Sequence, residues 1–417
     1  MRKSRKLSAV TALGSLTAAV ALLAGSPASA QTAPGGGSFP GSFLVPGTNT
    51  SIKIGGFAKV VGIYDIGRVN GDTTQIGSIP LTAGTQTHAV RLHARQSNIN
   101  IDTRTPTAYG DLTTFVLFDA FGQNVTGAEN ASNTQNVRLV YAYGTLGPFL
   151  AGQWVSLWAD TDAIAESVDP TPTVGVMNGT TNRAPQFRYT FAAPGGFSAA
   201  VSIENPEAEG TTGTTFTTAS VNPIVGGNVD KYPDILARAR LDGPWGHAAL
   251  TGMYRDMKLD SPAVAHVQKS GYGIEASGHI NTFGKDAFKA IAVFGKGLGH
   301  YVTDLGATAG IQEVSLATGA AASVPWVYGI SAGYTHWWTG ALRSSLQAGY
   351  DHVKNNTASV ALTAGEEKRH MVGIVNLIWS PVPQVDLGIE YEQGRRTIQT
   401  GASGNLSRVE VESVFKF

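Results

Sequence analysis

The sequence of 417 residues contains no cysteine and little charge. Without cysteine, the chain has no disulfide framework, no thiol nucleophile and no cysteine-ligated metal site. Asp, Glu, Lys and Arg make up only 14% of the chain, well below the roughly 25% typical of soluble globular domains. After residue 30 no stretch approaches the roughly 18 apolar residues of a membrane-spanning helix. The formal net charge of +0 argues against nucleic-acid binding.

The chain is instead rich in glycine, and its first 30 residues have the features of a cleaved export signal. It holds 51 glycines, and 42% of its residues are hydrophobic, a composition that favours a folded chain over a disordered one. A basic start is followed by an apolar stretch and by Ala28-Ser29-Ala30, which fits an A-x-A cleavage site. The alternative is an uncleaved membrane anchor. Residues 31–50 follow as a Pro/Gly-rich periplasmic lead-in without a helical period.

From residue 51 onward, apolar and polar residues alternate with the period of two that is typical of strands. For example, Ala237 and Ala239 alternate with Arg238 and Arg240. Counting the turns and loops gives about sixteen strands of the roughly ten residues that a tilted membrane strand needs. The sequence therefore predicts an all-β fold, a transmembrane antiparallel barrel with short periplasmic turns and long external loops. A secreted β-sandwich would need more charge, and no solenoid repeat is visible.

Short and long connections alternate along the predicted barrel. Tight turns are predicted at 106–110, 146–148, 194–196, 242–244, 283–285, 338–340 and 380–383. Longer loops are predicted at 67–88, 122–135, 161–182, 205–230, 258–268, 298–323, 354–366 and 395–406. Six tryptophans near predicted strand ends fit aromatic belts: Trp154, Trp158, Trp326, Trp337, Trp338 and Trp379. The two faces exchange parity between Arg91 and Asp102, which predicts a bulge near Arg95.

Several segments resemble the DcaP-like porins. They are residues 42–66, 93–111 and 138–160, the motif Glu166-Ser167-Val168-Asp169 and the run at 379–383. The resemblance implies a trimeric outer-membrane channel of sixteen strands that takes up small organic anions such as dicarboxylates. This chain differs from some members because its lead-in is rich in proline and glycine rather than a helical heptad segment.

Strand parity places a set of basic side chains on the inner, water-filled face of the barrel, because charges at the bilayer midplane cost roughly 2–4 kcal/mol when they face lipid. These residues are Lys59, Arg91, Arg138, Arg188, Arg238, Arg240, Arg255 and Arg343. A guanidinium keeps its charge and offers a planar fork to carboxylates. We expect the arginines to form an attractive wall for anionic solutes. Alternatively, each arginine pairs with an acid of a neighbouring strand and only supports the barrel.

The third long loop, at 160–182, is predicted to fold inward and narrow the channel, as the third loop does in trimeric porins. Its carboxylates would then lie opposite the basic wall, and opposed charges in a constriction focus the electric field. These are Asp160, Asp162, Glu166 and Asp169. The alternative is a surface loop kept in water by its acids.

The first and last strands have to pair antiparallel to close the barrel. If Phe417 lies beside Ile52, Glu410 lies opposite Lys59 and forms a favourable cross-strand pair. Other acids also reach the inner face on the last two strands: Asp386, Glu390, Glu392 and Glu412.

The sequence contains no convincing catalytic or metal-binding motif that would indicate an enzyme instead of a channel. The G-x-S-x-G match at 329–333 lies inside a strand with no helix after it, and the histidines have no metal-binding spacing. We therefore expect no enzyme, cofactor or metal, but a porin for passive diffusion of small, preferably anionic solutes. Its expected partners are the lipid bilayer, lipopolysaccharide and two further copies of the chain. The alternatives are a non-selective general porin, or a barrel enzyme or adhesin that acts through its long loops.

Overall fold

The computed structural model describes residues 36–82, 84, 87–122, 133, 135–169, 182–206, 209–212, 215–218, 231–261, 264–302, 314–316, 324–354 and 367–417. The predicted signal peptide at 1–30 lies outside the described residues, as do residues 170–181 of the predicted constriction loop. In the part of the chain that is described, no helix combines the length and the apolar character needed to cross a membrane.

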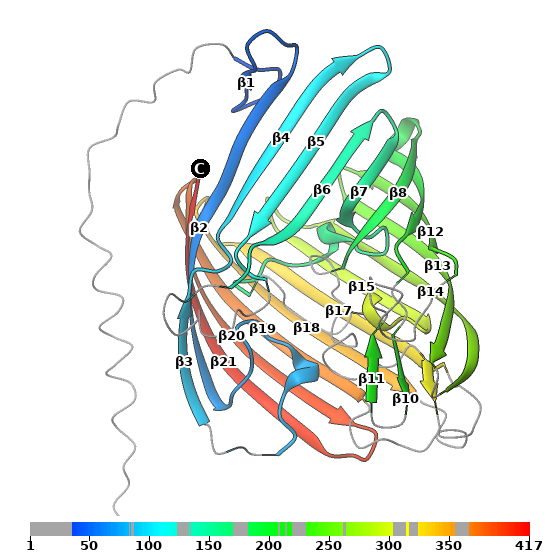
Figure 1. Ribbon diagram of the computed structural model, residues 1–417. Helices are drawn as coiled ribbons and strands as arrows, with labels where there is room; N and C mark the ends of the chain where they lie inside the picture. Colours follow the sequence, from blue (N-terminus) through cyan, green and yellow to red (C-terminus); the bar gives the residue numbers. More distant parts are fainter. Residues whose placement is uncertain are drawn as a thin grey trace, which may run out of the picture.

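Sixteen antiparallel strands form a closed barrel, in which β2 pairs with β21 to complete the wall (Figure 1). The first half of the wall consists of β2 (Ser51–Arg68), β3 (Thr87–His93) with β4 (Asn98–Thr107), β5 (Gly110–Asp119), β6 (Arg138–Leu146), β7 (Phe149–Val155), β8 (Arg183–Ala192), β9 (Phe197–Glu204) and β12 (Asp234–Gly243). The second half consists of β13 (Gly246–Ser261), β14 (Val264–Asn281), β15 (Ala287–Lys296), β17 (Trp326–Trp337), β18 (Leu342–Lys354), β19 (Glu367–Val382), β20 (Val385–Ile398) and β21 (Ser403–Lys416).

The smaller elements are not part of this wall. Strand β1 (Phe43–Leu44) forms a hairpin with the start of β2, and β10 (Glu209–Thr212), β11 (Thr215–Thr218) and β16 (Val314–Leu316) form a separate sheet. Four single-turn 3-10 helices complete the described structure: η1 (Ile76–Ser78), η2 (Thr161–Ala163), η3 (Pro194–Gly196) and η4 (Gly299–Tyr301).

All the predicted tight turns join successive strands at one end of the barrel, which we call the turn end; the other end is the loop end (Figure 1). Two predicted loops are wrong. In place of a loop at 258–268, β13 runs to Ser261 and β14 starts at Val264; in place of 395–406, β20 runs to Ile398 and β21 starts at Ser403. Here the strands continue although both of their faces carry polar residues, so the alternation that marks a strand is lost before the pairing ends.

The predicted bulge near Arg95 is confirmed. Val61 of β2 lies opposite His93 of β3, and Phe57 lies opposite Asn98 of β4. Residues 58–60 of β2 therefore face residues 94–97, and the extra residue reverses which side chains point inward. The strand remains one member of the wall although it is interrupted.

A second bulge was not predicted. Phe118 lies opposite Leu139 and Leu117 lies opposite Tyr141, so Val140 is the extra residue. The extra residue reverses the two faces of β6 after Val140, and Tyr141 and Tyr143 are on the inner face, where their rings contact Trp154. Trp158 is also no part of an aromatic belt, since it is fully buried inside the barrel.

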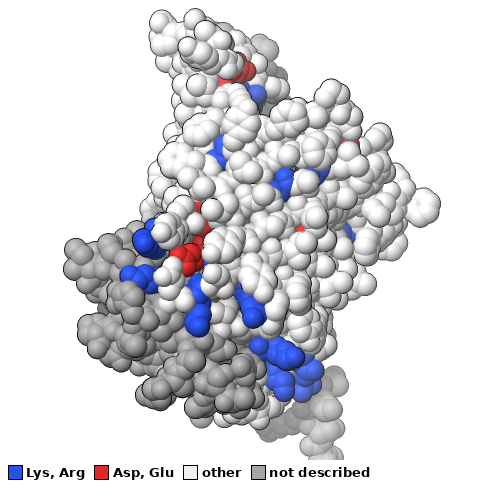
Figure 2. Space-filling view, turned by 90° about the vertical axis from the view of Figure 1, so that its right-hand side faces the viewer, with Lys and Arg blue, Asp and Glu red and all other residues white. Residues whose placement is uncertain are grey.

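The outer face is apolar over most of its height. Large hydrophobic side chains such as Phe191, Leu250, Ile330 and Leu346 are exposed there. Figure 2 shows one side of the barrel as a largely uncharged surface, with most of its Lys and Arg gathered toward the lower rim.

The predicted closure register is wrong. Lys59 lies opposite Val414, four residues from the predicted Glu410, and the amide of Phe417 donates to the carbonyl of Gly56 rather than lying beside Ile52. Glu410 lies opposite Ile63. Because side chains alternate with a period of two, a shift by an even number keeps every side chain on its predicted face, so alternation alone could not fix the register.

Candidate pore constriction

The loop between β7 and β8, here called L3, lies against the inner wall of the barrel over its described residues 156–169. Side chains of several wall strands donate hydrogen bonds to peptide carbonyls of L3 and of Val155, the residue before it. In order around the barrel these are Arg188 to Val155 (2.7 Å), Arg238 to Ala159 (3.0 Å), Lys289 to Ile164 (2.8 Å), Gln347 to Ala165 (3.1 Å), Asn376 to Glu166 (2.7 Å) and Lys59 to Val168 (2.9 Å). The prediction that this loop folds inward agrees with this course.

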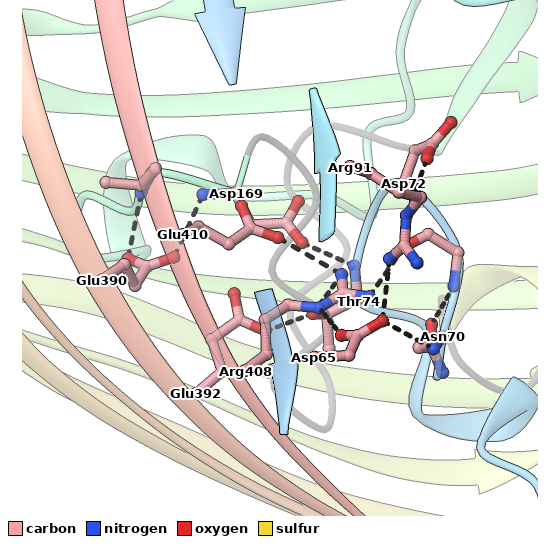
Figure 3. Close-up of polar contacts among 12 residues, drawn as sticks. Asp65, Asn70, Asp72, Thr74, Arg91, Asp169, Glu390, Glu392, Arg408 and Glu410 are labelled. Carbon is pink, nitrogen blue, oxygen red and sulfur yellow. Dashed lines mark hydrogen bonds and ion pairs between the residues drawn. The ribbon is translucent and has the colours of Figure 1, made fainter. Parts of the chain in front are cut away.

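Two buried glutamates hold the ends of the described part of L3. Glu204 of β9 accepts hydrogen bonds from the amide of Leu157 (2.8 Å) and from the hydroxyl of Ser156 (2.6 Å). Glu390 of β20 accepts from the amides of Val168 (2.9 Å) and Asp169 (3.0 Å), as Figure 3 shows. Hydrogen bonds from neutral donors to a charged acceptor are stronger than those between neutral groups, so these two carboxylates attach the loop firmly.

The underside of L3 packs on the wall without a gap. Trp158 and Ala163 belong to an apolar cluster with Leu236, Ile291 and other wall residues. Two wall glycines lie directly beneath the loop. A Cβ at Gly333 would lie 2.9 Å from Cβ of Ala165, and a Cβ at Gly388 would lie 2.8 Å from the side chain of Val168. Glycine at these positions therefore lets the loop approach the sheet closely.

The loop between β2 and β3, here called L1, also folds inward over its described residues 69–82. Ile76 and Ile79 are fully buried against Val372, Ile374 and Leu406 of the wall. This burial differs from the external loop predicted at 67–88. The two isoleucines, spaced three residues apart in a polar loop, were the signal that could have indicated its burial.

L1 and L3 meet at a buried junction on β20 and β21 (Figure 3). The amide of Thr74 in L1 donates to Asp169 of L3 (2.6 Å), and its hydroxyl donates to Glu392. Arg408 is fully buried there and donates to Asp65 (2.7 Å) and to Glu410 (3.2 Å). The junction therefore ties both loops to the seam where the barrel closes.

Three acids at this junction form the one group in the described residues with the spacing of a metal site. Carboxylate oxygens of Asp169, Glu392 and Glu410 lie within 4.8 Å of one another, and all three residues are buried. Arg408 and Thr74 already donate hydrogen bonds into this group. A guanidinium in the site supplies positive charge where a metal ion would supply it.

The side chains of all the predicted basic residues lie on the inner side of the barrel wall, but most of them are paired with acids. The pairs are Lys59 with Glu412 (2.7 Å), Arg91 with Asp65 (2.8 Å), Arg138 with Asp119 (2.7 Å), Arg240 with Asp162 (2.9 Å), Arg255 with Asp234 (2.8 Å) and Arg343 with Glu166. Arg255 is fully buried, so its predicted place on the solute path is wrong. Arg188 donates to a peptide carbonyl and has no counterion in direct contact among the described residues.

The loop acids were predicted to lie opposite the arginines, across a gap. Instead, they bind wall residues directly. Asp162 and Glu166 pair with Arg240 and Arg343. Asp160 is buried, lies 2.7 Å from Nε2 of His247 and accepts a hydrogen bond from Ser277 (2.7 Å). Asp169 turns toward the junction with L1. Because L3 lies flat on the wall, its acids neutralise their neighbours rather than forming an opposing wall.

The contacts of Asp160 predict that L3 stays docked in mild acid. Burial alone raises the pKa of this carboxyl, but the hydrogen bonds of His247 and Ser277 outweigh burial and hold the pKa below its ordinary value. The ionised carboxylate therefore stabilises the docked loop above the unfolded pKa of about 3.9, and this contribution is lost as the pH falls through the lower folded pKa. We expect single-channel current noise to rise only below about pH 4.

Asp160→Asn serves as the comparison for this pH series. Its noise should be higher than that of the wild type near neutral pH, because the charged acceptor is gone at every pH. A rise in wild-type noise already between about pH 7 and pH 5 would contradict the assigned role of Asp160.

Comparisons with known proteins agree with this geometry. The model of the porin subfamily matches residues 40–392. The outer membrane channel DcaP of Acinetobacter baumannii has 20% sequence identity and a TM-score of 0.74, over 90% of this chain and 99% of that chain. No curated protein sequence matches.

Two more distant solved structures share the fold. OmpT of Vibrio cholerae, in its trimer form, has 9% identity and a TM-score of 0.53, covering 88% of this chain and 99% of that one. An anion-selective porin from Comamonas acidovorans has 10% identity and a TM-score of 0.52, covering 88% and 100%. At these identities the likeness concerns the barrel alone.

Proposed function

Since this chain belongs to the porin subfamily and is a channel of the bacterial outer membrane, we propose that it lets small solutes diffuse passively through a water-filled pore and prefers anions such as carboxylates. In this orientation the turn end faces the periplasm and the loop end faces the exterior. The channel architecture also leaves no strand-to-helix nucleophile turn at the G-x-S-x-G match, since residues 329–333 lie within β17.

The observation that carries the anion preference is that L1 and L3 cover three inward glutamates while an inward arginine stays exposed. Glu390, Glu392 and Glu410 retain 1%, 0% and 1% of their exposure, because L1 and L3 cover them. By contrast, the side chain of Arg138 remains 36% exposed, against 10% for its partner Asp119. Water in the pore therefore meets guanidinium groups more than it meets these carboxylates, and charges at a constriction select among ions.

A second support is the pairing of the bases that hold L3. Arg188, Arg238 and Lys289 donate to carbonyls of the L3 segment, which are dipoles and do not cancel a unit charge. The nearest carboxylate oxygen of Glu275 is 3.9 Å from Arg238. These bases on β8, β12 and β15 attract anionic solutes toward this part of the inner wall.

We also propose that the channel works as a homotrimer in a bilayer whose outer leaflet contains lipopolysaccharide. The outward positions on β4–β6 include Thr103, Thr114, Ala142 and Gly144, which are small and could be covered by a second copy of the chain. The OmpT structure in trimer form is a precedent for such an assembly within the same fold.

Reversal potentials in a planar bilayer test the anion preference. We expect Arg188→Gln with Arg238→Gln and Arg240→Gln to lower the anion-to-cation permeability ratio by about threefold or more, because charges in a narrow pore set ion selectivity. Asp162→Asn, on the same loop, should raise the ratio because it removes a negative charge. Equal permeability in the wild type, or no shift in the triple variant, would favour a general porin without selectivity.

A further inference from the structure

The outer face of the barrel carries a row of basic side chains at the loop end. We call Lys296 of β15, Lys354 of β18, Arg369 of β19 and Arg395 of β20 the outer basic row. Lys296 and Lys354 lie opposite Trp326 on its two sides, so the three residues are direct neighbours across β15, β17 and β18. The next strands continue the row, since Arg369 lies opposite His352, and Arg395 lies opposite Met371.

The charges of this row are not matched by acids. Among the described residues, the outward positions of β15, β17, β18, β19, β20 and β21 contain no Asp or Glu. Lys296 lies over the ring of Trp326, 4.6 Å from its centroid, and Arg395 donates to the hydroxyl of Ser403 at 3.4 Å. Lys368, beside Arg369, adds a further positive charge close to His352.

The row has a defined depth relative to the apolar band. Toward the middle of the barrel, the next outward residues are aromatic rings: Phe294, Tyr328 and His352. The residues after these are apolar and exposed, such as Ile330 and Leu346. The order apolar, aromatic, basic is the order of hydrocarbon, interface and headgroup in a bilayer.

We propose that the outer basic row binds the phosphate groups of a glycolipid in the external leaflet of the outer membrane. Arginine offers a planar fork that fits phosphate oxygens in a bidentate manner, and lysine adds a mobile point charge. A row along the edge of the apolar band fits headgroups that lie in a layer, whereas a dissolved anion would need a concave site. The proposal rests on the proposed function only for the orientation that puts the loop end outside.

Native mass spectrometry of the detergent-purified protein tests this proposal, with diphosphorylated lipid A as the probe. We expect Lys354→Gln with Arg369→Gln and Arg395→Gln to lower the fraction with bound lipid A by about tenfold or more, because each charge contributes to attraction of an anionic headgroup. Lipid A without its phosphates should bind the wild type as weakly as the phosphorylated form binds the triple variant. Inorganic phosphate should not displace the lipid, since the site recognises headgroups held in a layer.

A matched control removes the same number of charges elsewhere, in Lys53→Gln with Lys231→Gln and Lys285→Gln, and should bind lipid A like the wild type. The charge-preserving variant Lys354→Arg with Arg369→Lys and Arg395→Lys should also bind, which separates loss of charge from misfolding. Equal binding by the neutralised variant and the wild type would overturn the proposal, and so would equal binding of the dephosphorylated lipid. Reversal potentials of the neutralised variant in a neutral bilayer should equal those of the wild type, so the lipid site and the anion preference can fail separately.

Discussion

Glu390→Ala is expected to detach the end of L3 from the wall and to give a wider, noisier channel. The substitution removes the carboxylate that accepts from the amides of Val168 and Asp169 and from the amide group of Asn376 (3.0 Å). Each buried donor left without an acceptor costs about 1–3 kcal/mol, which is enough to favour a loop that leaves the wall. Single-channel conductance should rise by roughly half or more, because the constriction sets the resistance of the pore.

A nearby acid favours the opposite outcome, in which L3 stays attached to the wall. Glu390 lies opposite Glu410 on the neighbouring strand, so its removal also relieves repulsion between carboxylates. The loss of several hydrogen bonds should outweigh this gain, because Arg408 already compensates Glu410. Asp111→Asn is the control, since Asp111 is an exposed carboxylate at the turn end, away from the loop. Wild-type conductance and noise in Glu390→Ala would show that Glu390 does not hold the loop.

Arg408→Leu should produce the largest loss of stability of any single substitution at the closure seam. Arg408 is fully buried and binds Asp65 (2.7 Å), Glu410 (3.2 Å) and the carbonyl of Gly71 (2.7 Å). Removing one partner of a buried ion pair leaves the other charge uncompensated and costs about 3–5 kcal/mol. The free energy of unfolding in urea, measured in detergent micelles, should fall by this amount.

A second substitution separates charge from packing. Asp65→Asn in the Arg408→Leu background should recover part of the lost stability, because it removes the carboxylate that has lost its partner. Arg395→Gln, an exposed arginine on the neighbouring strand, should change the free energy of unfolding by less than about 0.5 kcal/mol. If Arg408→Leu were equally mild, the junction would not hold the barrel closed.

The alternation of residue types was enough to predict the barrel and most of its faces. It depends only on local sequence, since each strand has to present apolar side chains to lipid and polar ones to the pore. Its failures are also local. At Val140 one extra residue reversed the faces, and no turn-forming residue marks that bulge. By contrast, the bulge near Arg95 was predictable, because charged residues lie on both sides of the parity change.

Properties that depend on distant segments could not be predicted in this way. The register between β2 and β21 differs from the predicted one by four residues, a shift that leaves inward and outward positions unchanged. The burial of L1 depends on contacts of Ile76 with β19 and β21, more than 290 residues away in sequence. For the same reason the acid partners of the arginines came from loops and turns, such as Asp162 for Arg240, and not only from neighbouring strands.

The attachment of L3 has a consequence for how this channel can diversify. The wall strands hold the loop through peptide carbonyls and amides, which every amino acid provides, as Gln347, Asn376 and Glu390 do. Side chains of the loop that point away from the wall can therefore be exchanged without releasing its backbone. The permeation properties of the protein are thus open to rapid evolutionary change, and to redesign as a nanopore sensor, while the frame that carries them stays constant.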